Sequence, residues 1–282
     1  MKGLALDGGG CQGVGQANIL ENIDVSMFDF FVGTSIGSVN AAICATELNV
    51  DLPVFFHEEM PKIFRGHWWK RFKPFTPRYG DKALNKALIK IFDGIQLGDV
   101  KKPLFITCVD IDTKRLKVFD STDPNDASLP LWEVIRSATA AETYFSPWKG
   151  RADGGIFVNN PSMVAVAAAC NKLDCKLNEI ELCSIGTGAE NSNNTINGLR
   201  SYSFISWGIW LITALLDGAA STMHEYFVRS LPLKNYVRIE FVKDSTWKLD
   251  SVKDMYAAEK AWKYDILRGI EIVNMFLNNE NI

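Results

Sequence analysis

The feature that most constrains the fold is the pattern GTSIG at residues 33–37, which stands between an apolar run and a helical one. The run from Phe28 to Val32 predicts a buried strand, and residues 38–48 predict a helix. A serine at a strand-to-helix turn, with a glycine two residues to either side, is typical of a nucleophile elbow. The glycines let the backbone turn sharply, so that the Ser35 hydroxyl lies clear of the sheet. The alternative is a glycine-rich turn with a polar residue that caps the helix.

A glycine cluster precedes this turn. Lys2 to Leu6 predicts a first strand, and residues 13–23 predict a first helix. Between them, the backbone N–H groups of Gly8, Gly9 and Gly10 are unobstructed by side chains, which is typical of an anion site at a helix N-terminus. The anion is either the oxyanion of an acyl-transfer transition state or a nucleotide pyrophosphate.

The pyrophosphate alternative depends on the pattern G-x-G-x-x-G, which Gly8, Gly10 and Gly13 satisfy. A dinucleotide site also needs an acidic residue at the end of the second strand, about twenty residues on. Here the second strand runs into Ser35, and Asp29 stands near its start. No Lys-Ser or Lys-Thr pair follows the glycines, which excludes a P-loop.

A serine nucleophile needs a general base, and the chain has only three histidines that could serve: His57, His67 and His224. Only His224 falls late enough for the chain order of an α/β-hydrolase triad, and that fold places several strands before its serine. The other candidate is Asp153, whose two following glycines allow a close backbone approach. A free aspartate has a pKa of about 3.9, so the site must raise that pKa by desolvation. The alternative is a turn residue in an ordinary Asp-Gly hairpin.

In combination these motifs resemble the patatin-like phospholipases, lipid acyl hydrolases with a Ser–Asp dyad. The resemblance spans most of residues 1–190 and depends on five motifs that occur in the family's order: DGGGCQG at 7–13, GTSIG at 33–37, DGG at 153–155, NNP at 159–161 and SIGTG at 184–188. One departure is Gln12, where the family usually has Arg or Lys.

The resemblance implies roles for particular residues. Ser35 is expected to be the nucleophile, Asp153 the base, and the N–H groups of Gly8, Gly9 and Gly10 the oxyanion hole. It also implies a three-layer α/β/α fold with a central, mostly parallel sheet. No metal or cofactor is expected, since the sequence shows no cluster of oxygen or sulfur ligands. The expected substrate is a membrane phospholipid or another acyl lipid.

Composition agrees with an enzyme of this kind. A chain of 282 residues that is 47% hydrophobic can bury one large core, so we expect a single domain over residues 1–282. The net charge of −3 argues against a nucleic-acid partner. The six cysteines lack zinc-site spacing and are expected as buried thiols. The first strand begins at residue 2, which leaves no room for a signal peptide. We therefore expect a cytoplasmic protein that contacts the membrane peripherally.

Further strands and helices alternate along the chain. We expect strands at 103–110, 115–119 and 179–185, and helices at 131–140, 160–171 and 255–277. Residues 190–197 are expected to form a loop. Residues 204–220 form either a core helix or part of an acyl-chain pocket, and the basic and aromatic residues 65–75 form either a lipid headgroup interface or a self-packed loop.

The function that best fits the sequence is a serine esterase of phospholipase A type, cleaving carboxylic-ester bonds of lipids. Two alternatives stay open. One is a patatin-like effector whose hydrolysis is latent until a partner or nucleotide signal activates it, as the resemblance allows. The other is a nucleotide-binding α/β module, which would need neither Ser35 nor Asp153.

Overall fold

The computed structural model describes residues 1–66, 76–190, 220–244 and 247–280. Three stretches singled out in the sequence lie wholly or mostly outside these residues. They are the loop at 190–197, the apolar stretch at 204–220 and the basic and aromatic stretch at 65–75. The roles predicted for these three stretches therefore stay predictions.

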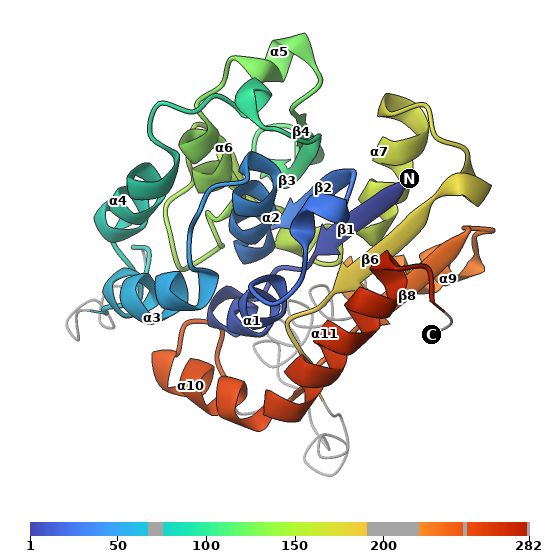
Figure 1. Cartoon of the computed structure of the whole chain (residues 1–282). Coiled ribbons are helices and arrows are strands. Elements are labelled where there is room, and N and C mark those ends of the chain that lie inside the picture. The colour runs from blue at the N-terminus through green and yellow to red at the C-terminus, as the bar shows by residue number, and fades with distance from the viewer. Residues whose placement is uncertain (67–75, 191–219, 245–246, 281–282) are drawn as a thin grey trace, which may run out of the picture.

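A seven-stranded sheet lies at the centre of the described chain (Figure 1). Its strands are β1 (Lys2–Leu6), β2 (Phe30–Thr34), β3 (Leu104–Asp110), β4 (Arg115–Asp120), β5 (Arg151–Asp153), β6 (Glu181–Ile185) and β8 (Asn235–Ile239). The order is β4-β3-β2-β1-β6-β8, and β5 also pairs with β3. The pairs from β3 through β2, β1 and β6 to β8 are parallel, whereas β4 and β5 run antiparallel to β3. Strands β7 (Ala189–Glu190) and β9 (Val242–Lys243) form a separate parallel pair.

Helices connect most of these strands and cover both faces of the sheet. The α-helices are α1 (Val14–Leu20), α2 (Ile36–Thr46), α3 (Leu52–Ile63), α4 (Asp81–Phe92), α5 (Pro124–Ala127), α6 (Leu131–Ala138), α7 (Ser162–Lys172), α9 (Met223–Ser230), α10 (Val252–Ala261) and α11 (Lys263–Leu277). Short 3₁₀ turns are η1 (Gly10–Gly13), η2 (Val25–Met27), η4 (Leu97–Asp99), η5 (Gly154–Ile156) and η6 (Leu177–Glu179).

The strands alternate between two apolar cores because successive side chains point to opposite faces. On β1, Leu4 and Leu6 lie in the core beneath α1, α2, α3, α4, α6, α10 and α11. Ala5, between them, lies in the smaller core beneath α7 and α9. On β2, Phe31 joins the first core and Phe30 the second. The predicted three-layer α/β/α architecture with a mostly parallel sheet is confirmed.

The predicted elements around the nucleophile elbow shift by two residues. The strand expected at 28–32 is β2 (Phe30–Thr34), and the helix expected at 38–48 is α2 (Ile36–Thr46). Phe28 is fully buried, but it lies in the turn before the strand, where its N–H donates to the Val25 carbonyl at 3.2 Å. Its hydrophobicity therefore reflects core packing and not strand pairing.

The single helix predicted at 255–277 is wrong, because the structure has two helices, α10 and α11, that meet at Trp262. The backbone of Trp262 leaves helical geometry, with φ −87° and ψ 7°. Its indole Nε1–H donates to the Val242 carbonyl at 2.7 Å, and its ring stacks on Phe241 at 4.5 Å between centroids. The apolar stripe continues across the break because both helices pack on the same core.

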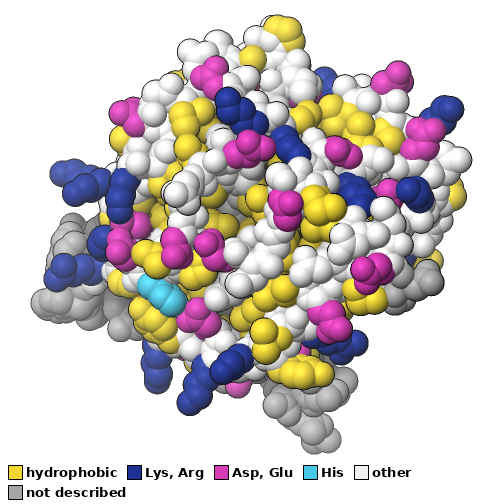
Figure 2. Space-filling view, viewed as in Figure 1, with side chains coloured by type: hydrophobic (Ala, Val, Ile, Leu, Met, Phe, Trp, Pro, Cys, Tyr) yellow, Lys and Arg dark blue, Asp and Glu magenta, His cyan; other side chains and the backbone are white. Residues whose placement is uncertain are grey.

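The surface of the view in Figure 2 shows acidic and basic side chains interspersed, and neither sign gathers into a continuous patch on that face. Among the helices of the described residues, none is both long enough and apolar enough to cross a membrane.

We expect Trp262→Ala to lower the free energy of unfolding by about 3–5 kcal/mol, because it leaves a cavity and removes the contacts with Phe241 and Val242. Trp262 is 1% exposed. Tyr264, two residues further on, is 74% exposed, so Tyr264→Ala is the control and should change stability by less than about 0.5 kcal/mol. Urea unfolding of the two variants measures the difference, and equal losses would contradict this account of the helix junction.

Candidate active site

Ser35 occupies a strained turn between β2 and α2. Its φ of 52° and ψ of −124° lie in a region that non-glycine residues rarely adopt. The turn is tight enough to exclude side chains on both flanks. A Cβ on Gly37 would lie 2.2 Å from the Leu6 carbonyl oxygen, and one on Gly33 would lie 2.5 Å from the Gly37 carbonyl oxygen. The predicted glycine spacing is thus required by backbone contact between α2 and the end of β1.

Asp153 lies directly against this serine. The Ser35 hydroxyl donates a hydrogen bond to Asp153 Oδ2, and the Gly155 N–H donates to Asp153 Oδ1 at 2.8 Å. Strand β5 brings the carboxylate here by pairing with β3, which sets Asp153 opposite Cys108. The turn after Asp153 is the 3₁₀ turn η5, not the hairpin turn considered as the alternative. Ser35 and Asp153, which are 118 positions apart in sequence, are thus in contact.

Burial changes the acidity of Asp153, which is 4% exposed. Loss of solvent raises the pKa of its carboxyl group to about 6, against the opposing hydrogen bonds from Ser35 and Gly155. This is the shift that the sequence argument required. At neutral pH the carboxylate remains mostly ionised, yet it is a stronger proton acceptor than a free aspartate.

The glycine loop lies beside Ser35. A Cβ on Gly8 would come within 3.2 Å of Ser35 Cβ, and Gly10 has a φ of +56°, in the left-handed region that favours glycine. The Gly8 N–H donates to the Asn159 carbonyl at 3.1 Å. The N–H groups of Gly9 and Gly10 make no hydrogen bond to the described residues. Of the three predicted donors, Gly8 is therefore engaged, and Gly9 and Gly10 are available for an oxyanion.

A buried ion pair anchors the start of this loop. Arg238 on β8 donates from Nη1 to Asp7 Oδ1 at 2.8 Å and from Nη2 to Asp7 Oδ2 at 2.6 Å. It also donates to Ser184 Oγ at 2.7 Å and contacts the Glu240 carboxylate. Burial alone would lower the pKa of Arg238, but the carboxylates of Asp7 and Glu240 raise it well above its usual range. The sequence argument missed Arg238, because nothing local marks its distant partner.

The histidines take other roles in the described residues. His57 Nε2 lies 2.9 Å from Glu259 Oε2, in a contact between α3 and α10. His224 lies on α9, and burial lowers its pKa against an opposing hydrogen bond with the Phe157 backbone. His67 falls outside the described residues. Neither His57 nor His224 makes a hydrogen bond to Ser35.

Asp29, which a dinucleotide site would need near the glycine loop, lies at the other end of the sheet. It precedes Phe30, the first residue of β2, which pairs with Gly3 near the start of β1. Its carboxylate accepts a hydrogen bond from the Lys2 N–H at 2.7 Å. The glycine loop instead follows the carboxyl end of β1.

An apolar cavity opens from the dyad. Its volume is about 490 Å³, and Ser35, Asp153 and the three glycines of the loop are among the residues that line it. Side chains from α2, α3, α4 and the segment after α6 form the apolar walls: Ile36, Val39, Phe55, Met60, Ile63, Phe64, Leu84, Leu88 and Phe145. A hydroxyl, a carboxylate and two N–H groups on the wall of an apolar cavity suit acyl transfer from a lipid.

Comparison with known proteins agrees with this geometry. The family model "Patatin-like phospholipase" matches residues 4–166, and the chain belongs to that family. Patatin-like protein 4 of Arabidopsis thaliana is 25% identical, over 94% of this chain and 84% of that protein. The cGAMP-activated phospholipase of Pseudomonas aeruginosa is also 25% identical, over 91% and 82% of the two chains.

The comparisons also include a relative described as probably inactive and a solved structure with the same fold. Probable inactive patatin-like protein 9 of Arabidopsis thaliana is 24% identical, over 84% of this chain and 74% of that protein. The crystal structure of VipD from Legionella pneumophila superposes with a TM-score of 0.51 at 14% identity. That match covers 96% of this chain but only 66% of VipD. The likeness confirms the α/β fold.

Replacement of the buried carboxyl gives a pH-dependent test. Because folding raises the pKa of Asp153, its contribution to stability is full below about pH 3.8 and is lost as pH rises through about 6. As the pH rises from about 4 to 7, we expect the free energy of unfolding of Asp153→Asn to increase by about 3 kcal/mol relative to that of the wild type. Chemical denaturation across this range measures the change.

Asp110→Asn is the control, because the stability that Asp110 contributes changes with pH in the opposite direction. Hydrogen bonds from Thr113 lower the pKa of Asp110, so its contribution to stability is lost as pH falls. A stability difference between wild type and Asp153→Asn that stays flat over the same range would contradict the burial of an ionised Asp153.

Proposed function

We propose that this chain is a lipid acyl hydrolase of phospholipase A type, which cleaves carboxylic-ester bonds of phospholipids or related acyl lipids. Members of its family act on acyl lipids. One observation carries the proposal: the Ser35 hydroxyl donates to the buried Asp153 carboxylate, and both residues line an apolar cavity. Both groups needed for attack are thereby in contact before substrate arrives.

In the first half of the reaction Ser35 Oγ attacks the ester carbonyl carbon while Asp153 Oδ2 accepts the hydroxyl proton. The carbonyl oxygen becomes an oxyanion, which the N–H groups of Gly9 and Gly10 stabilise. The tetrahedral intermediate collapses as the C–O bond to the leaving alcohol breaks. Asp153 returns the proton to that alcohol, and the acyl group remains on Ser35.

In the second half a water molecule takes the place of the alcohol. Asp153 accepts a proton from it, and the hydroxide attacks the acyl-enzyme carbonyl. The same N–H groups stabilise the second oxyanion. Collapse breaks the bond to Ser35 Oγ, the proton passes to that oxygen, and the fatty acid leaves. The apolar walls of the cavity hold the acyl chain throughout.

The latent-effector alternative draws support from the similarity to a cGAMP-activated phospholipase. A relative described as probably inactive also shows that membership alone does not establish activity. The formed contact between Ser35 and Asp153 favours hydrolysis without an activator. Ester hydrolysis by the purified chain, measured with and without added cyclic dinucleotide, separates the two hypotheses.

We expect a fluorophosphonate probe to label Ser35 and no other serine. Mass spectrometry of the labelled peptide identifies the residue. Ser35→Ala should abolish both labelling and ester hydrolysis, because it removes the attacking oxygen. Ser38→Ala is the matched control and should keep the label, since the Ser38 hydroxyl donates to the Ser35 backbone carbonyl and does not reach Asp153. Labelling at Ser38 or Ser184 would overturn the assignment.

We expect Asp153→Asn to lower kcat on a soluble ester by about two to four orders of magnitude, because the amide cannot accept the proton. In the wild type, kcat/KM should rise with pH through about 6 as Asp153 ionises. His224→Ala is the control and should lower kcat much less than Asp153→Asn does. Near-normal turnover in Asp153→Asn with loss in His224→Ala would indicate a histidine triad instead.

A further inference from the structure

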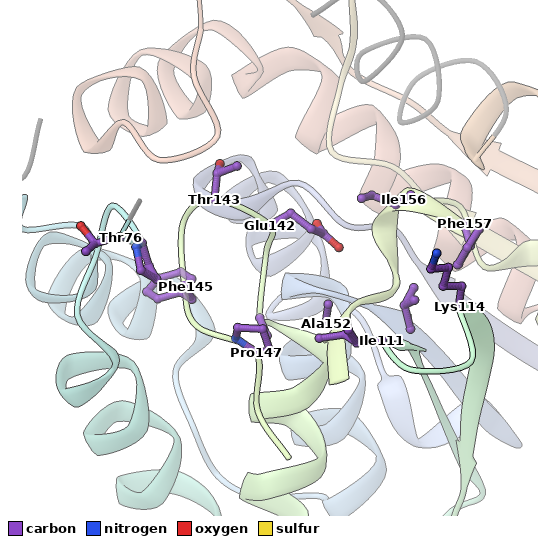
Figure 3. Close-up of a pocket in the computed structure, with 13 residues that line it drawn as sticks. Thr76, Ile111, Lys114, Glu142, Thr143, Phe145, Pro147, Ala152, Ile156 and Phe157 are labelled. Atoms are coloured by element: carbon purple, nitrogen blue, oxygen red, sulfur yellow. The ribbon is translucent and has the colours of Figure 1, made fainter. Parts of the chain in front are cut away.

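A second cavity adjoins the candidate active site. It has a volume of about 720 Å³ and lies against the β3–β4 hairpin, the segment after α6 and the turn η5 (Figure 3). Its walls are mostly apolar and include Val109, Ile111, Pro147, Ala152 and Phe157. Apolar walls of this extent suit a hydrocarbon chain better than a polar headgroup.

The two cavities share part of their lining. Glu142 and Ile156, from two separate segments, line both cavities, and so do Thr143 and Phe145. Figure 3 shows the Glu142 carboxylate extending from its own segment into the space toward the segment that carries Ile156. Asp153 lines the first cavity beside Ile156. Two polar residues, Glu142 and Thr143, thus belong to the lining that the two apolar cavities share, and Asp153 lines the first cavity.

This arrangement matches a molecule with two apolar arms joined by a polar, ester-bearing linker. We propose that the substrate is a two-chain lipid: the cavity at the dyad holds the acyl chain that is cleaved, and the second cavity holds the other chain. The inference depends on the proposed acyl hydrolase function. It goes further by naming the second cavity as the site that selects two-chain lipids over single-chain lipids.

Glu142 fits the place of the linker. Burial, together with the smaller effect of the charge of Asp153, raises the pKa of its carboxyl group to about 7. Near neutral pH a substantial fraction of Glu142 is therefore protonated and can donate a hydrogen bond to an ester oxygen. A fully ionised carboxylate at this position would instead repel the oxyanion that forms at Ser35.

The decisive measurement is the ratio of kcat/KM for a diacyl phosphatidylcholine to that for the matching single-chain lysophosphatidylcholine. Ile111→Asp places a charge in the second cavity, and Ile111→Trp narrows it. Ile89→Asp on α4 is the matched control, because Ile89 is 36% exposed against 38% for Ile111 and lines neither cavity. The ratio cancels any loss that folding imposes on both substrates.

We expect a wild-type ratio well above one and a fall of about tenfold or more in both Ile111 variants, because each methylene group lost from an apolar site costs about fourfold. The ratio should hold in Ile89→Asp. A wild-type ratio at or below one, an unchanged ratio in the Ile111 variants, or an equal fall in Ile89→Asp would overturn the inference.

Failure of the proposed function is recognised separately. If the wild type hydrolyses no ester, binding of a non-hydrolysable dialkyl ether lipid and of its single-chain counterpart is measured by calorimetry. Tighter binding of the two-chain ether, lost in Ile111→Asp but not in Ile89→Asp, would keep the inference about the second cavity. Equal affinity for the two ethers would overturn it whatever the catalytic activity.

Discussion

The close backbone contact between the turn at Ser35 and the end of β1 governs the geometry of the site. With no Cβ at Gly37, α2 approaches the Leu6 carbonyl closely enough to begin at the carboxyl end of the sheet. The glycine loop follows Leu6 directly, so the same contact sets Gly8 against Ser35. The nucleophile and the candidate oxyanion donors are therefore positioned by one backbone approach between two neighbouring parallel strands.

Three carboxyl groups in or near the candidate site are held in different ways: Asp7 and Asp153 are buried, and Glu142 is half-buried. Burial raises the pKa of Asp7 to about 7 against the opposing charge of Arg238, whose guanidinium holds the carboxyl group through two hydrogen bonds and makes it a structural anchor. Asp153 has only neutral partners, so burial raises its pKa and leaves it a stronger base. Partial burial, and to a smaller extent the charge of Asp153, raises the pKa of Glu142 to about 7, above that of Asp153. Three acids in one region thus take three roles because their environments differ.

Local signals in the sequence were enough for the elements that carry the site. The alternation of apolar runs with glycine-rich turns predicted β1 with its bounds and placed the elbow between a strand and a helix. The bounds of β2 and α2 shifted by two residues because Phe28 is buried without pairing. The break at Trp262 was missed because an apolar stripe with helical spacing does not reveal that an indole is held by a neighbouring strand.

The sequence by itself determined which residue types stand at the elbow, the glycine loop and the Asp-Gly-Gly motif, because each of these depends on local backbone geometry. Only the tertiary structure decided that Asp153, not His224, lies against Ser35, and that Gly8 is engaged by Asn159. It alone showed Arg238 behind Asp7. These contacts join segments far apart in the chain through strand pairing and packing, which no local pattern encodes.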